Sequence, residues 1–151
     1  MRDFYVLGIN FLHSDTSACI FKNGKLIAAV EEERFSRIKH TSSFPVKSIN
    51  FCLNEVKIDI SDLDIITINS NPFSSLDKKI LFTLKNFKRY ILALKSISNI
   101  KKKITIKKLI SLNFKKKFKG KIVYLDHHLS HIASSSFFSN FDESVNLSID
   151  G

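Results

Sequence analysis

The dipeptide Asn23-Gly24 is the feature that most limits what this chain can fold into. Asn-Gly is the strongest short-range signal for a two-residue hairpin turn, because both residues tolerate a positive φ angle. Apolar runs flank it in SACIFKNGKLIAAVEEE, so residues 17–23 and 25–32 are predicted to pair as antiparallel strands. An earlier apolar run predicts another strand over residues 4–10. The chain is therefore expected to open with strands that can form an antiparallel sheet.

Helical and strand patterns alternate after the hairpin. Pro45 follows a Ser/Thr loop and is suited to the first turn of a helix, and Asp126 is suited to an N-cap. The further predicted elements are a helix over 46–57, a strand over 62–70, a strand over 121–126, a helix over 127–138 and a strand over 144–150.

The basic charge belongs to one segment. The chain has a formal net charge of +10, yet residues 78–121 hold 16 Lys and Arg and no Asp or Glu, which leaves −6 for the remainder. Residues 74–120 show apolar side chains three and four apart, which predicts basic amphipathic helices. We favour a solvated helical face with no nucleic acid or membrane as partner. The alternative is a module that binds RNA or an anionic surface.

No apolar run is long enough to span a membrane, and the N-terminus lacks the pattern of a signal peptide. A cytoplasmic location is therefore expected. Cys19 and Cys52 lie in apolar contexts, where buried reduced thiols are favoured over a disulfide.

The order of strands and helices predicts an α/β fold, namely one ribonuclease-H-like lobe of the actin and sugar-kinase superfamily with a five-stranded mixed sheet. Residues 1–143 would form this lobe, with the basic helical insertion at about 74–120. Residues 144–151 would begin a second lobe that is otherwise missing. We therefore expect an N-terminal piece of a longer protein. A naturally short coding sequence is the alternative.

The strongest candidate for chemistry is His127-x-x-x-His131. Side chains four apart share one face of a helix, so two imidazoles can bind one cation such as iron or zinc. Asp150, at the end of the next predicted strand, is a plausible third ligand. His128 points about 100° away and is expected to be a bystander. Two surface histidines without a metal are the alternative.

Two polar segments are further candidates. The loop NFLHSDTSA places His13 and Asp15 where they could act in acid–base chemistry or bind an acceptor, unless it is only a polar turn. The stretch EEERFSRIKH, residues 31–40, is either a solvated loop with ion pairs or a site where Lys39 or an arginine reaches a phosphate.

The blocks LGINFLHSDTSACIFKNGKLIAAVEEERFSRIKHTSSFPVKSINFCL and DHHLSHIASSSFFSNFDESVNLSIDG together resemble the N-terminal domain of the O-carbamoyltransferases. That family modifies antibiotics, nodulation factors and related bacterial glycosides, and is similar in fold to the enzymes that make threonylcarbamoyladenosine in tRNA. The resemblance implies transfer of a carbamoyl group from carbamoyl-adenylate to a hydroxyl of a sugar or natural product. A C-terminal domain would make the adenylate from carbamoyl phosphate and ATP, so these residues alone are expected to be inactive.

The resemblance also implies roles for individual residues. His127, His131 and Asp150 match ligands of a divalent metal, iron(II) in at least some members, and a further aspartate ligand of the family is not in this chain. Lys39 matches a residue that contacts carbamoyl-adenylate. The family's His-Asp pair in the first loop reads His13-Ser14-Asp15 here, with one residue inserted, so either His13 or Asp15 could approach the acceptor hydroxyl. An inactive truncated paralogue is the remaining alternative.

Overall fold

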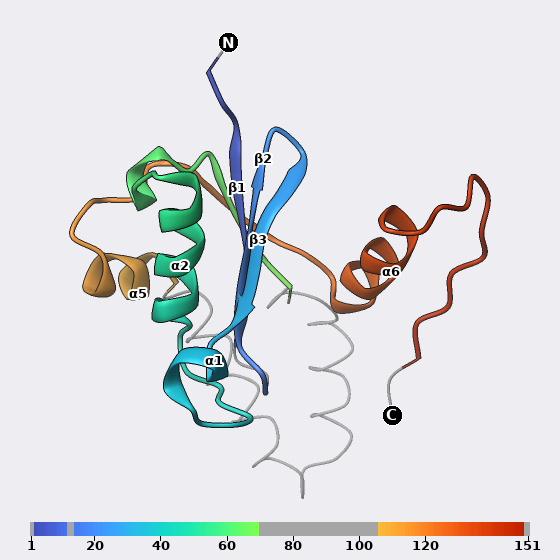
Figure 1. Cartoon of the computed structure of the whole chain (residues 1–151), viewed down its shortest axis with the longest axis horizontal. Coiled ribbons are helices and arrows are strands. Elements are labelled where there is room, and N and C mark those ends of the chain that lie inside the picture. Colours follow the sequence, from blue (N-terminus) through green and yellow to red (C-terminus); the bar gives the residue numbers. More distant parts are fainter. Residues whose placement is uncertain (1, 12–13, 70–105, 150–151) are drawn as a thin grey trace, which may run out of the picture.

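The computed structural model describes residues 2–11, 14–69 and 106–149. They form one five-stranded mixed sheet with helices on both faces (Figure 1). The predicted α/β class and five-stranded mixed sheet are therefore confirmed. The strands are β1 Tyr5–Asn10, β2 Ser17–Lys22, β3 Lys25–Glu31, β4 Ile65–Ile68 and β5 Lys121–Tyr124. The helices are α1 Glu33–Ser36, α2 Val46–Val56, α5 Ile106–Asn113 and α6 His127–Phe137, with a short 3₁₀ turn at Ile60–Asp62.

The strand order is β3-β2-β1-β4-β5. Strands β1, β2 and β3 form the predicted antiparallel meander, while β4 pairs parallel to β1 and β5 parallel to β4. The predicted turn is present, with φ of 51° at Asn23 and 80° at Gly24, as a type I′ turn requires. Strands β1, β3, β4 and β5 consequently end at the same edge of the sheet, which we call the carboxyl edge.

The core lies on the face of the sheet that α2 and α5 cover (Figure 1). Alternate residues of β1 point into it because side chains of a strand alternate between its two faces. Leu7 of β1 and Ile66 of β4 are fully buried against Ile49 of α2. Ile106 and Ile110 of α5 are buried in the same cluster, so the described end of the basic insertion uses its apolar side chains as core.

Glu32 fixes the start of α2 to the end of β3. Its carboxylate accepts hydrogen bonds from the backbone N–H groups of Lys47 (3.2 Å) and Ser48 (2.8 Å) and from the Ser48 hydroxyl (2.7 Å). Helix N-termini leave such N–H groups without partners within the helix, and a carboxylate is favourable there. The prediction of a solvated loop with ion pairs over residues 31–40 is therefore wrong for Glu32, which is buried. It holds for Arg34, which pairs at 3.7 Å with Glu31 and with Glu33 on the surface.

The predicted strand over residues 62–70 is shorter in the structure. The 3₁₀ turn Ile60–Asp62 comes first, closed by reciprocal bonds between Asp59 and Asp62, so only Ile65–Ile68 enters the sheet.

The helix expected to run to residue 120 ends at Asn113. Phe114 and Phe118 pack against the core beyond it, and Gly120 lies so close to the backbone before β4 that a Cβ there would clash with the Asp64 carbonyl oxygen. This close approach leads directly into β5, where the Lys121 N–H donates to the same carbonyl at 2.9 Å. The part of the helical prediction over 74–105 lies outside the described residues.

The strand expected at 144–150 is wrong over residues 144–149, which form no regular structure. Val145, Leu147 and Ile149 are 101, 81 and 79% exposed. A strand is stabilised by pairing with a neighbour, and no described strand lies beside this segment. In the described part of the chain, no helix is long and apolar enough to cross a membrane.

Candidate functional site

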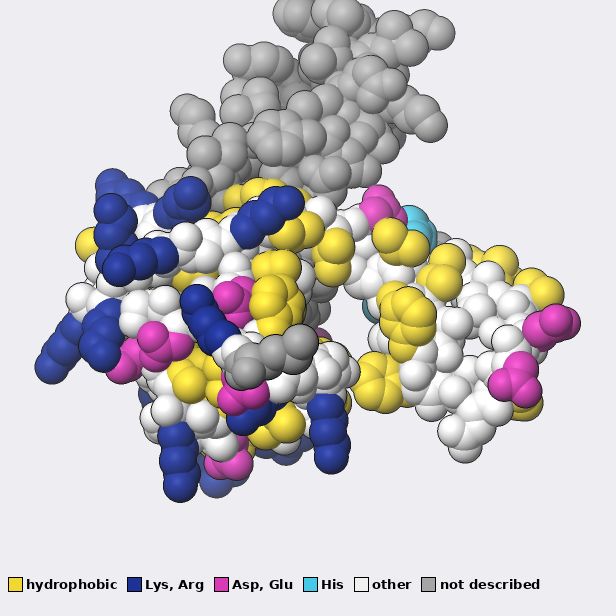
Figure 2. Space-filling model, turned by 90° about the horizontal axis from the view of Figure 1, so that it is seen from above, with side chains coloured by type: hydrophobic (Ala, Val, Ile, Leu, Met, Phe, Trp, Pro, Cys, Tyr) yellow, Lys and Arg dark blue, Asp and Glu magenta, His cyan; other side chains and the backbone are white. Residues whose placement is uncertain are grey.

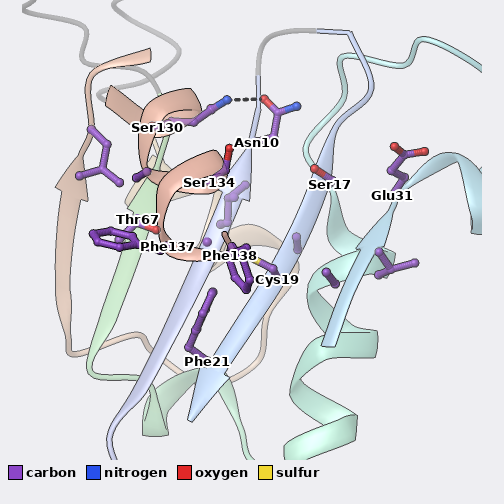
Figure 3. A pocket seen from close by; sticks show the side chains of 18 of the residues that line it. Asn10, Ser17, Cys19, Phe21, Glu31, Thr67, Ser130, Ser134, Phe137 and Phe138 are labelled. Carbon is purple, nitrogen blue, oxygen red and sulfur yellow. Dashed lines mark hydrogen bonds between the residues drawn. The ribbon is translucent and has the colours of Figure 1, made fainter. Parts of the chain in front are cut away.

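The carboxyl edge collects the loops that hold the predicted site residues. The loop after β1 contains Asp15, the segment after β3 contains Lys39, and α6 follows β5 directly. In open α/β sheets, ligands bind outside the carboxyl ends of the strands. The ends of β1 and β4 are joined there by a hydrogen bond of 2.8 Å from the Asn69 amide to Asn10 Oδ1 (Figure 3).

Helix α6 begins at Asp126, as predicted. The Asp126 carboxylate accepts a hydrogen bond from the Leu129 N–H at 3.2 Å, which caps the helix and sets where its turns start. His127 and His131 then stand one turn apart, with their Nε2 atoms 3.2 Å apart and their ring centroids at 4.6 Å. His128 instead lies against Ser148, with its Nδ1 at 3.0 Å from the hydroxyl. The histidines thus separate into a pair and a neighbour.

The separation of the two Nε2 atoms suits a shared metal ion. Ligand nitrogens about 2.1 Å from a metal and 3.2 Å from each other subtend roughly 100° at it, which both tetrahedral and octahedral sites accept. The described residues hold no group of three His, Cys, Asp or Glu that could bind a metal. Asp150, the predicted third ligand, lies outside the described residues. The structure therefore provides the imidazole pair alone.

The first loop and the EEERFSRIKH segment meet through Asp15 and His40. Asp15 Oδ1 lies 3.0 Å from His40 Nδ1. The backbone joins the same two segments, because the Thr16 N–H donates to the Thr41 carbonyl at 3.2 Å. Sequence reasoning did not single out His40 as the partner of Asp15. The only signal was its place beside Lys39. His13 lies outside the described residues.

Lys39 sits in the exposed turn between α1 and α2. Arg37, in a left-handed conformation with φ of 60°, ends α1 and turns the chain toward it. An exposed ammonium group next to His40 is accessible to an anionic ligand at the carboxyl edge. This position agrees with the predicted contact to a phosphate, which stays a prediction.

A cavity of about 790 Å³ lies between α6 and the face of the sheet opposite the core (Figure 3). It is lined by Gly8 and Cys19 of the sheet and by Ser134 of α6, together with the rings of Phe137 and Phe138 (Figure 3). Neither the paired histidines nor Asp15, Lys39 and His40 line it. The described residues for which the sequence predicts chemistry therefore lie at the carboxyl edge and outside this cavity.

Neither cysteine is suited to nucleophilic work. Burial raises the pKa of the Cys52 thiol to about 12 and also raises that of Cys19, and both thiols are free. The prediction of reduced thiols is confirmed. Cys52 is buried as expected, whereas Cys19 is half-buried at the cavity.

Comparison with known proteins decides the family. The model of the carbamoyltransferase N-terminus matches residues 5–151. This chain belongs to the carbamoyltransferase family. Its described carboxyl edge is thus the edge of a carbamoyltransferase N-terminal domain, and the family resemblance stated from the sequence is confirmed.

Individual relatives agree with this membership. The chain is 35% identical over 155 residues to the Synechocystis protein sll1178, covering 97% of this chain and 25% of the relative. It is 32% identical over 143 residues to the nodulation protein NolNO of Sinorhizobium fredii, covering 93% and 20%. The chain thus spans between a fifth and a quarter of the length of these relatives. Among solved structures, YeaZ from Pseudomonas aeruginosa aligns over 89% of this chain and 48% of its own, with 10% identity and a TM-score of 0.41.

Proposed function

We propose that the protein carrying these residues is an O-carbamoyltransferase that acts on a hydroxyl of a sugar or natural product. The observation that carries the proposal is the carboxyl edge of a carbamoyltransferase-family domain, where the joined Asp15 and Lys39 segments follow β1 and β3 and a histidine pair follows β5. The donor would be carbamoyl-adenylate, formed from carbamoyl phosphate and ATP elsewhere in the whole protein. The relatives are four to five times longer than the aligned region, so a protein of their length has room for such a further active site.

A proposal about the superfamily of the fold accompanies the proposed activity. We infer a ribonuclease-H-like lobe of the actin and sugar-kinase superfamily, supported by the strand order β3-β2-β1-β4-β5 with β4 and β5 parallel to β1. A second lobe beginning near residue 144 would give Val145, Leu147 and Ile149 the strand partners that these alternating apolar residues need.

His127 and His131 would hold a divalent metal, iron(II) by family resemblance, with Asp150 as a further ligand. When bound, the metal would act as a Lewis acid toward a phosphate or carbamoyl oxygen. Lys39 would hold the adenylate phosphate as a point charge. The acceptor oxygen then bonds to the carbamoyl carbon, the bond from that carbon to the phosphate oxygen breaks, AMP leaves, and the hydroxyl proton passes to a base at the carboxyl edge.

The test uses protein expressed from its whole coding sequence. It is incubated with carbamoyl phosphate, ATP, iron(II) and either a chitin tetrasaccharide or an aminoglycoside. Mass spectrometry should detect an acceptor heavier by one carbamoyl group, together with release of AMP. Replacing His131 by Ala should lower the rate by about 100-fold or more, because loss of a ligand exceeds the effect typical of its supporting residues.

His128→Ala is the matched control on the same helix, and its rate should stay within about threefold of wild type, since His128 is not a proposed ligand and its Nδ1 lies at the Ser148 hydroxyl. An unchanged rate in His131→Ala would overturn the metal assignment. No product from wild-type protein with either acceptor would favour the inactive paralogue.

A further inference from the structure

The contact between Asp15 and His40 defines which nitrogen of His40 is available. Asp15 Oδ1 lies 3.0 Å from Nδ1. An ionised carboxylate only accepts hydrogen bonds, so the proton of a neutral His40 must lie on Nδ1. Nε2 then carries the lone pair and makes no hydrogen bond with a described residue. Because the His40 side chain is 77% exposed, this nitrogen is open to a ligand.

The backbone around the pair is built to bring these two side chains together. Asp15 and His40 both adopt the left-handed conformation, with φ of 64° and 54°. Residues other than glycine rarely adopt it, and such positions cluster at functional sites. The backbone of Asp15 is also fixed to the end of β1, because the Asn10 side-chain amide donates a hydrogen bond to the Asp15 carbonyl at 2.9 Å.

Stability does not explain the arrangement. The side chains of Asp15 and His40 are 44 and 77% exposed, and exposed ion pairs contribute little to folding. Two residues thus adopt an unfavourable backbone conformation, although the contact between their side chains contributes little to the stability of the fold. A carboxylate bound to Nδ1 with Nε2 open to a substrate is instead the arrangement by which a histidine is oriented as a general base.

We propose that His40 is the general base of the transfer site and that Asp15 is its positioning residue. This inference rests on the proposed function and deepens it, because neither His13 nor Asp15 then needs to touch the acceptor proton. His40 Nε2 takes the proton as the acceptor oxygen bonds to the carbamoyl carbon and AMP departs, and Asp15 stabilises the imidazolium that forms. Imidazole is the side chain that most often serves as a general base in enzymes. Its neighbour Lys39 would place the donor phosphate at the same turn.

Two substitutions of His40 separate a base from a structural link. In His40→Asn the side-chain amide N–H replaces Nδ1–H and keeps the bond to Asp15, but nothing replaces Nε2. In His40→Ala both are lost. The variants are made in the whole protein and assayed with carbamoyl phosphate, ATP and the acceptor that wild type carbamoylates. We expect His40→Asn and His40→Ala to lower kcat/KM alike, by about 10²–10⁴-fold, the usual contribution of a general base.

Asp15→Asn should lower kcat/KM by a smaller factor. It should also change the acidic limb of the pH profile of kcat/KM, because the orienting charge is lost while the base remains. His128→Asn, the same substitution at a histidine without a proposed role, should match wild type within about threefold.

A His40→Asn variant as active as wild type, with His40→Ala impaired, would show that His40 only links the two loops. It would overturn the base assignment while leaving the proposed function intact. Wild-type protein that carbamoylates neither the chitin tetrasaccharide nor the aminoglycoside would overturn the proposed function itself.

Discussion

Helices α2 and α6 are each 11 residues long and lie on opposite faces of the same sheet, yet they are used differently (Figure 1). Four residues of α2 are buried, and none of α6 is. Phe137 at the end of α6 is 84% exposed, and hydrophobic side chains gather over α6 and the segment after it (Figure 2). The comparison indicates that the α2 face holds the packed core, while α6 carries the imidazole pair at the carboxyl edge.

The two faces of the sheet explain the difference. The α2 face carries large aliphatic side chains that fill the space under the helix. The α6 face of the sheet carries small residues, namely Gly8, Cys19 and Thr67, and α6 faces them with serines and Ala133. Because these residues do not fill the space, a cavity of about 790 Å³ remains between them. Gly8 cannot be enlarged easily, since a Cβ there would lie 2.7 Å from the Cys19 sulfur.

The largest expected effect is a deletion on the α2 face. Ile66→Ala removes a fully buried side chain of β4 and should lower the free energy of unfolding by about 2–5 kcal/mol, measured by urea denaturation. Thr67→Ala, the next residue on the opposite face, is the matched control and should cost less than about 1 kcal/mol. Equal losses would contradict the division of the sheet into a packed and an open face.

The next effect tests how α2 is anchored. Glu32→Gln replaces one of the two accepting oxygens by an N–H₂ that faces the N–H of either Lys47 or Ser48, and should cost about 1–3 kcal/mol of unfolding free energy. Ser48→Ala removes only the hydroxyl bond, and its loss should be the smaller one. If Glu32→Gln were as stable as wild type, the carboxylate would not be what fixes the start of α2.

Alkaline pH should weaken the same packed face. Burial raises the pKa of Cys52 from 9.0 in the unfolded chain to about 12 in the fold. The contribution is fully present below pH 9 and is lost as pH rises toward 12, because the unfolded chain releases the proton first. Stability should fall by about 1.4 kcal/mol per pH unit within this window. Urea denaturation of Cys52→Ala across the window should lack this component. An identical alkaline slope in both proteins would assign it to other groups.

The smallest effect is expected on α6. Phe137→Ser exchanges a side chain that is already 84% exposed and should change the free energy of unfolding by no more than about 0.5 kcal/mol. It should, however, reduce self-association of the chain in light scattering, because exposed apolar patches promote it. A loss of stability comparable to that of Ile66→Ala would show that α6 packs as tightly as α2.

The parts of the fold that could be predicted depend on short sequence signals. Asn23-Gly24 fixed the hairpin, Asp126 fixed the start of α6, and the spacing of His127 and His131 set the imidazole pair one turn apart. Each depends on residues close in sequence, whose backbone preferences act wherever the chain folds. The motif blocks at both ends also carried the family resemblance that the comparisons confirm.

Tertiary contacts decided the rest. The pairing of Asp15 with His40, the burial of Glu32 over α2 and the end of α5 before Phe114 all join residues brought together by the folded sheet and its connecting loops. Residues 144–149 show the converse, since their alternation predicts a strand that no described neighbour pairs with. Periodicity by itself determined which elements this protein could form. Only the tertiary structure determined which polar side chains meet at the carboxyl edge, because hydrogen bonds between distant loops depend on the sheet that positions them.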